Sequence, residues 1–278
     1  MNRTRFWLLW ITTITLAFVP ILLALTRHAA DSDLLSYIPL VPAVSLYLLY
    51  VRRGRLNTAY RSSFFWAIVL GAVGAAALAA GLSLRASLSL NDYLALATLA
   101  YVSLIAAGGF LFLGSTWMIS AAFPMAFLIF LVPLPDAAVH ALETASVIGS
   151  AEVSAFLFRI TGTPLLRDGV IFILPGIVLQ IAQECSGINS SWMLFITSLV
   201  ASNLFLTSPW RRLVLVLFVF PLAIVRNSIR ILTIGLLCVH IGPHMIDSII
   251  HRRGGPFFFG LSLVPLFLLL MWLRRKPR

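Results

Sequence analysis

The sequence predicts an all-α polytopic membrane protein of about eight transmembrane helices. Of its 278 residues, 60% are hydrophobic and only 10% are charged, and the mean hydropathy is +1.01. Soluble domains carry about 25% charged residues, so lipid is the natural solvent for this much apolar side chain. The charged residues also stand in short clusters between long apolar runs, as they do in proteins that cross a membrane repeatedly.

Each predicted span is a run of mostly apolar residues close to the length of about 20 that crosses a bilayer. The first run follows a basic start and lacks a small-residue cleavage site, so we interpret it as a retained helix rather than a signal peptide. No linker divides the chain, and we predict a single integral membrane domain over 1–278. The predicted spans are 6–26, 36–51, 64–84, 93–113, 116–132, 187–206, 213–241 and 256–273.

The basic residues predict the orientation of these spans. With the N-terminus in the cytoplasm, twelve of the 20 Lys and Arg residues fall in short cytoplasmic segments, as the positive-inside rule favours, and all nine acidic residues fall outside. We therefore expect a multi-pass protein of the inner (cytoplasmic) membrane with both termini in the cytoplasm. The twelve residues are Arg3, Arg5, Arg52, Arg53, Arg55, Arg61, Arg211, Arg212, Arg274, Arg275, Lys276 and Arg278.

The net charge of +11 raises the question of nucleic-acid binding. The basic residues are not interleaved with aromatic residues on one face, which argues against that class of partner. Short basic clusters at the ends of apolar runs fit anchoring to anionic lipid headgroups instead. We expect membrane lipid, and no nucleic acid, as a partner.

The one long segment between predicted spans is 133–186, which this orientation places outside the membrane. It opens with Pro-Leu-Pro-Asp at 133–136, a helix stop followed by an N-cap signal. Residues 137–160 predict a short amphipathic helix lying in the membrane interface. Residues 169–180 form an apolar stretch around a Pro-Gly turn and predict a β-hairpin before the sixth span. We hypothesise that this segment forms a roof that excludes water from a site beneath it.

Cys185 lies in a polar run, where the outer segment meets the sixth span. A thiol near a helix N-terminus, the positive end of the helix dipole, is readily deprotonated to the nucleophilic thiolate. Free cysteines are usually small buried hydrophobes, but such a cysteine needs no polar neighbours like Ser186, Gly187 and Asn189. Cys238 is the only other cysteine and there is no CxxC pair, so neither a disulfide scaffold nor a metal framework is indicated.

Two arginines, Arg226 and Arg230, lie within the seventh apolar run, with Asn227 between them. An arginine in hydrocarbon costs about 3 kcal/mol or more, so an intramembrane arginine marks a functional site by default. The two lie one helical turn apart on one face. The alternative is that they extend to the outer headgroups, which suits Arg226 better because mainly apolar residues follow Arg230.

Three histidines follow these arginines. His240 and His244 have helical spacing that could bind a metal, but a zinc site takes three or four protein ligands, and Gly242-Pro243 interrupts the helix. We therefore predict neither a metal nor a cofactor. His251 precedes the last span at the predicted outer face. If the segment around it is helical, Asp247 lies one turn earlier and could orient its imidazole.

The predicted topology brings Cys185, Arg230 and His251 to the same outer side from three parts of the chain. These are the parts of an acyl-transfer site: a thiolate attacks a carbonyl, an imidazole moves protons, and a guanidinium stabilises developing negative charge. Two other classes stay open. A transporter or lipid-handling protein would bind an anionic headgroup with its arginines, although the chain lacks the internal repeat common in transporters. A non-catalytic partner of envelope or exopolysaccharide assembly would tolerate loss of Cys185.

A set of short motifs occurs along the chain in a specific order. The motifs are Pro-Leu-Pro at 133–135, Gly-Thr-Pro-Leu-Leu-Arg-Asp-Gly at 162–169, Leu-Pro-Gly at 174–176, Cys-Ser-Gly at 185–187, Asn227-x-x-Arg230 and His251. Cys185 precedes Arg230 by 45 residues, and His251 follows Arg230 by 21. From about Tyr37 to the C-terminus, with a core at about 37–273, the chain resembles the exosortase/archaeosortase family of polytopic cysteine transpeptidases that process PEP-CTERM-type proteins.

The resemblance implies a role for each site residue. It implies Cys185 as the nucleophile, Arg230 as the stabiliser of the transition state and His251 as the acid and base. It also implies substrates that are secreted proteins with a C-terminal sorting signal, made of a short motif, a transmembrane helix and a basic tail. The residues expected to bind substrate or support the site are Asn227, Arg226, Ser186, Gly187, Asn189 and Asp247.

Two positions depart from the family pattern. The family often has an arginine where this chain has Asn189, which puts substrate recognition near the nucleophile in doubt. Many members have Gly-Trp after the histidine, where this chain has Gly-Gly-Pro at 254–256. Neither departure removes a residue with an implied catalytic role.

Overall fold

The computed structural model describes residues 2–57, 59–181, 187–247 and 255–275, which are mainly helical with one small sheet. Within these residues, eight helical segments are long and apolar enough to cross a membrane, which confirms the predicted all-α polytopic membrane fold. They are Arg3–Ala30, Asp33–Arg55, Phe64–Ser83, Leu90–Leu113, Asp136–Ile160, Ile188–Phe205, Pro209–His240 and Gly255–Arg274.

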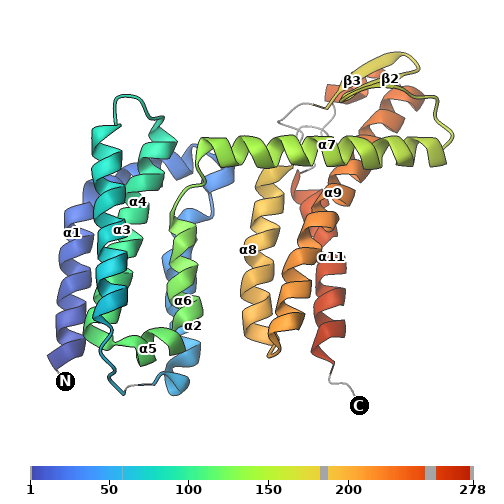
Figure 1. The fold of residues 1–278 in the computed structure, drawn as a ribbon. Helices are drawn as coiled ribbons and strands as arrows, with labels where there is room; N and C mark the ends of the chain where they lie inside the picture. The colour runs from blue at the N-terminus through green and yellow to red at the C-terminus, as the bar shows by residue number, and fades with distance from the viewer. Residues whose placement is uncertain (1, 58, 182–186, 248–254, 276–278) are drawn as a thin grey trace. The chain divides into compact units, whose positions relative to one another are not determined.

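The chain forms two compact units, Met1–Ala138 and Val139–Arg278. In the first unit, α1 (Asn2–Ala30), α3 (Phe64–Ser83) and α4 (Leu90–Gly108) lie side by side (Figure 1). Small side chains on α3 allow its backbone to approach α4 closely, as they do in other membrane helix pairs. This unit also contains η1 (Asp33–Leu35), η2 (Ile38–Leu40), α2 (Val41–Arg52), η3 (Arg53–Arg55) and the π-helix η4 (Gly109–Leu113).

Residues 116–132, predicted as the fifth span, do not form one continuous helix. Pro124 lacks an N–H, and its ring would clash with the carbonyl of Ser120 in a regular helix, so the helix breaks after Ser120. The prediction of an unbroken span here is wrong because apolar composition does not register this proline. The segment is divided among α5 (Ser115–Ser120), α6 (Ala122–Phe127) and η5 (Leu128–Leu131).

A continuous helix of 25 residues, α7 (Asp136–Ile160), follows and agrees closely with the predicted helix at 137–160. Its start is held within the first unit: Asn91 Nδ2 donates a hydrogen bond to Asp136 Oδ1 at 2.7 Å, and Ser89 Oγ donates one to Asp136 Oδ2 at 2.6 Å. The rest of α7 belongs to the second unit. The length and apolar composition of α7 also suit a membrane span. The location of α7 in the membrane interface therefore stays a prediction.

The second unit contains three helices that lie side by side, α8 (Ile188–Phe205), α9 (Pro209–His240) and α11 (Gly255–Arg274). Buried leucines and valines from all three form their common core. Within this unit, α7 runs crosswise to α8 and α11 (Figure 1). After α9, the short helix η7 (Pro243–Asp247) begins where Gly242 adopts a positive φ of 145°.

The predicted β-hairpin is confirmed. β2 (Ile171–Leu174) and β3 (Ile177–Gln180) are antiparallel and joined by a Pro-Gly turn in which Gly176 has a φ of 83°, and β1 (Leu166–Asp168) pairs with β2. Glycine reaches this φ without the steric cost that other residues meet. In the sequence, the sheet comes directly before the segment that contains Cys185, the predicted nucleophile.

One face of the sheet packs on α7 and α9. Phe172 is fully buried and meets Phe158 of α7 edge to face, with ring centroids 6.0 Å apart. Gly235 of α9 leaves room for this contact, because a Cβ there would lie 2.5 Å from the Phe158 ring. On the rim, Arg167 Nη2 donates a hydrogen bond to Glu152 Oε1 at 2.7 Å, and this bond raises the pKa of Arg167.

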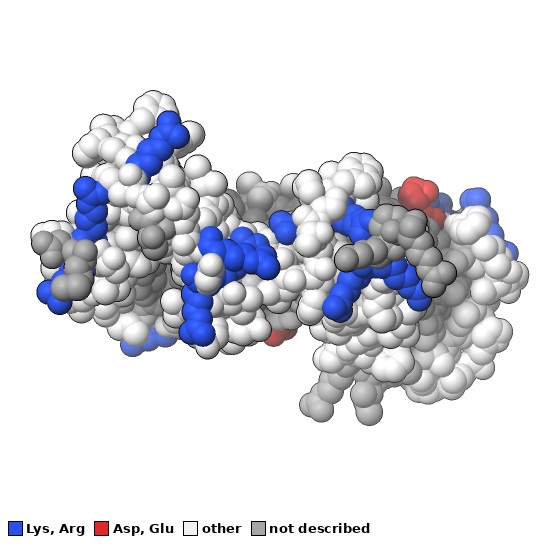
Figure 2. Space-filling view, turned by 90° about the horizontal axis from the view of Figure 1, so that it is seen from below, with Lys and Arg blue, Asp and Glu red and all other residues white. Residues whose placement is uncertain are grey.

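Basic side chains gather at one end of the helices in each unit. In the first, the guanidinium of Arg3 lies 3.4 Å from the centre of the Tyr60 ring. In the second, Arg211 Nη1 donates a hydrogen bond to the carbonyl of Leu273 at 3.0 Å, joining the start of α9 to the end of α11. Figure 2 shows such clusters, with few acidic side chains in view. This grouping is what the positive-inside pattern leads us to expect within each unit.

Candidate active site

The predicted site residues divide into those that the structure describes and those that it does not. Cys185, Ser186 and His251 lie outside the described residues. Asp247 is the last residue of η7, but its side chain also lies outside the described part of the chain. The described members are Gly187, Asn189, Arg226, Asn227 and Arg230.

Gly187 is the N-cap of α8 and adopts the left-handed conformation, with a φ of 66°. Its carbonyl accepts hydrogen bonds from the hydroxyl of Ser191 at 2.8 Å and from Arg226 Nη2 at 2.9 Å. A Cβ at this position would lie 2.8 Å from Arg226 Nη2 and 3.2 Å from Asn227 Oδ1. Both its φ and its close approach to α9 therefore call for glycine.

Arg226 joins α9 to the first turn of α8. Its side chain is 5% exposed, and Nη2 donates hydrogen bonds to the carbonyl of Gly187 and, at 3.0 Å, to Ser191 Oγ. Among the described residues, Nη1 of Arg226 has no hydrogen-bond partner. The guanidinium is thus buried between helices rather than extended to the surface.

Asn227 and Ser228 join α9 to α7. Asn227 is 2% exposed, and its Nδ2 donates a hydrogen bond to Ser150 Oγ at 3.0 Å. Ser228 is fully buried, and the single proton of its hydroxyl is shared between the carbonyl oxygens of Ile224 at 2.8 Å and Ser150 at 3.2 Å. Burial of a polar side chain in apolar surroundings costs free energy unless the side chain is hydrogen-bonded. These bonds therefore favour one packing arrangement of α7 against α9.

Arg230 and Asn189 flank this group. Arg230 is half-buried one turn after Arg226, near enough for the two positive charges to repel. Asn189 is half-buried in the first turn of α8. The structure thus brings Gly187, Arg226 and Asn227 into contact and places Arg230 and Asn189 next to them.

Sequence reasoning missed the serine on α7 that completes the group. Ser146, Ser150 and Ser154 recur every four residues, and Ser150 and Ser154 are fully buried. Small residues at this spacing on one helix face are a signal of close helix packing, and this signal could have identified Ser150. Ser191 and Ser228 stand beside predicted residues but were not assigned a role.

His240 and His244 do not share a helix. His240 ends α9, whereas His244 lies in η7, beyond the turn at Gly242. Their side chains are exposed. The i,i+4 spacing of these two histidines is therefore not realised within one helix.

The group is electropositive at the start of α8. A helix N-terminus carries partial positive charge from its free N–H groups, the first turn of α8 has no acidic residue, and Arg226 adds a full charge. Such a turn stabilises a thiolate or an oxyanion. Gly187 follows Cys185 by two positions, so this electropositive turn begins two residues after the predicted nucleophile.

Comparison with known proteins identifies the family of the chain. The family model of the transmembrane exosortases matches residues 25–268, a range that contains every predicted site residue. Comparison with curated proteins and with solved structures gives no match. The matched range covers most of the 278 residues, and the chain therefore belongs to the transmembrane exosortase family.

Proposed function

We propose that the protein is a membrane-embedded cysteine transpeptidase or protease that cleaves the C-terminal sorting tail of secreted proteins. Membership of the exosortase family supports a sorting role. The observation that carries the proposal is the contact between Arg226 and Gly187, which holds an electropositive turn two positions after Cys185. A transporter needs no such turn beside a cysteine.

In the proposed reaction, the Cys185 thiolate attacks the carbonyl carbon of the scissile peptide bond. Arg230 stabilises the negative charge that develops on the carbonyl oxygen. The C–N bond then breaks, and the imidazolium of His251 gives its proton to the leaving amine of the tail. The sorted protein is left as a thioester on Cys185.

The thioester is resolved by a second nucleophile. An acceptor amine or hydroxyl attacks the thioester carbonyl, loses its proton to the neutral imidazole of His251, and releases the Cys185 thiolate. Water in the same place gives hydrolysis, so transfer and proteolysis share the first step. We place this chemistry at the outer face of the inner membrane, because the positive-inside pattern puts the basic ends of the helices in the cytoplasm.

The partner that the proposal requires is a secreted protein whose sorting signal consists of a short motif, a transmembrane helix and a basic tail. Such a tail would remain in the bilayer and present its motif at the outer face. Basic residues at its end would stay in the cytoplasm for the same electrostatic reason that applies to this chain. The proposal requires no metal or cofactor.

The test is to replace Cys185 with Ala in cells that produce a tagged protein with such a tail. We expect an uncut, membrane-held form to accumulate while the variant inserts at wild-type levels. Cys238→Ala, on α9, is the matched control and should process the substrate normally. Normal processing by Cys185→Ala would remove the nucleophile from the proposal and favour a non-catalytic role in envelope assembly.

A further inference from the structure

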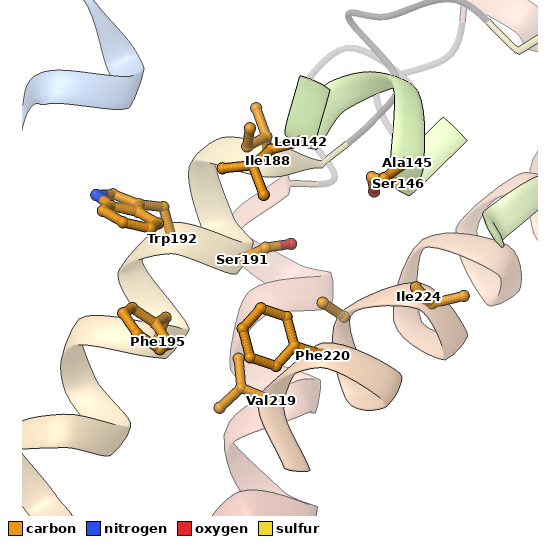
Figure 3. A pocket seen from close by; sticks show the side chains of 11 residues that line it. Leu142, Ala145, Ser146, Ile188, Ser191, Trp192, Phe195, Val219, Phe220 and Ile224 are labelled. Carbon is orange, nitrogen blue, oxygen red and sulfur yellow. The ribbon is translucent and has the colours of Figure 1, made fainter. Parts of the chain in front are cut away.

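A pocket of about 170 Å³ opens beside the candidate site, between α7, α8 and α9. Figure 3 shows Ala145 of α7, Trp192 of α8 and Phe220 of α9 around it. All of its lining residues except Ser146 and Ser191 are hydrophobic. The pocket therefore suits an apolar group and offers no charged side chain to a ligand.

The pocket shares a residue with the candidate site. Ser191 lines it, and the same hydroxyl donates to the carbonyl of Gly187 and accepts from Arg226 Nη2. Ile188, another lining residue, comes directly after Gly187 and three positions after Cys185. A group that fills the pocket therefore lies against the turn that follows the predicted nucleophile.

The size of the pocket limits what fits. An apolar cavity of about 150 Å³ accommodates one benzene molecule. A pocket of about 170 Å³ therefore takes a single ring or a branched aliphatic group, and is too small for the full length of a lipid acyl chain. A single apolar side chain of a polypeptide has the matching size.

We infer that this pocket binds one apolar side chain of the substrate polypeptide, close to the bond that is cleaved, and so helps to determine which sequences are processed. The inference rests on the proposed function and adds a specificity pocket to it. A large apolar side chain removes more surface from water or lipid headgroups than a small one does, and it would position the scissile carbonyl at the start of α8. A difference of one methylene group in such a pocket changes rates by roughly 10- to 200-fold.

Cross-linking tests the occupant without requiring catalysis. Benzoylphenylalanine replaces Phe220, an exposed lining residue on α9, in the full-length Cys185→Ala protein, in membranes that contain the tagged tail-bearing protein. Position 217, an equally exposed leucine on the same helix and outside the pocket, is the control. We expect an adduct with the tagged protein from position 220 and none from position 217. Lipid adducts alone, or no adduct, from position 220 would overturn the inference even if Cys185 proves to be the nucleophile.

Substrate preference provides the second measurement. Residues on either side of the cleaved bond are changed one at a time to Leu or Ala, and initial rates of processing are compared. Ala145→Phe, which fills the pocket, should reduce the preference for Leu at one substrate position by roughly 10-fold or more. Thr144→Phe should leave that preference unchanged. An unchanged preference in Ala145→Phe, with normal processing, would show that no substrate side chain occupies the pocket.

Discussion

Arg226 Nη2 lies 2.9 Å from the carbonyl oxygen of Gly187, and this bond joins the middle of α9 to the N-cap of α8. The two residues are 39 positions apart in the chain. Because Gly187 follows the predicted nucleophile by two positions, we expect loss of this bond to affect substrate processing. It offers the most direct test of the site.

Replacing Arg226 with Ala should reduce substrate processing by roughly 100-fold, since a misplacement of about 1 Å in an active site has that effect. Loss of a hydrogen bond from a charged donor should also cost about 1.5–3 kcal/mol of stability. Processing of the tagged substrate and thermal unfolding in detergent measure the two effects. Arg226→Lys keeps the charge and should restore part of the processing. If processing in both variants simply follows their stability, so that Lys restores the two together, Arg226 has a purely structural role.

Gly187→Ala should reduce both stability and substrate processing more than the addition of one methyl group usually does. The new methyl group would lie 2.8 Å from Arg226 Nη2, and the residue must keep a φ of 66°. Overpacking typically costs about 1–3 kcal/mol, and the left-handed conformation costs about 1–2 kcal/mol more for a residue with a Cβ. We expect a lower unfolding temperature and little processing.

Gly255→Ala at the start of α11 is the control for this change, because a Cβ there meets no described atom within 4 Å. It should unfold close to the wild-type temperature. Equal effects of the two substitutions would contradict the close contact between Gly187 and α9.

The hydrogen bond between Asn227 and Ser150 should show energetic coupling. Each Ala substitution alone leaves the other buried polar group without its partner, at a cost of about 1–3 kcal/mol. The double variant should lose less than the two single losses added together, with a coupling of about 0.5–3 kcal/mol. Chemical unfolding of the four proteins measures it. Strict additivity would mean that the two side chains do not interact.

Phe172→Ala should open a cavity under the sheet and cost about 3–5 kcal/mol of stability, because the ring is fully buried between the sheet, α7 and α9. Val178→Ala is the control, since Val178 is 62% exposed on the other sheet face. The roof hypothesis adds that deleting residues 169–180 should abolish or strongly reduce processing. Full activity of the deletion variant would contradict that hypothesis.

The location of α7 can be measured with cysteine labelling. If the helix lies in the interface, single cysteines at positions 141, 148 and 156, all exposed along its length, should react to similar extents with a membrane-impermeant maleimide added from outside. If α7 spans the bilayer, reactivity should occur only near one end. Proteins with Cys185 and Cys238 replaced provide the background for the labelling.

Much of the fold follows from local sequence. Long apolar runs can only be satisfied in lipid as helices, which is why the predicted and observed bounds of α8 agree closely. The Pro-Gly turn specifies the β-hairpin because its conformation depends on these two residues. The prediction at 116–132 failed where a single proline outweighed the apolar pattern.

The sequence by itself determined most of the apolar spans, the hairpin and the family of the chain, because these depend on residues close together or on their order. Only the tertiary structure decided that Arg226 is buried against Gly187 and that Asn227 is paired with Ser150, 77 positions away. A buried polar group must find a partner, and which partner it finds depends on how the helices pack. An arginine within an apolar run predicted a site, but the packing of α7, α8 and α9 determined which residues the arginine contacts.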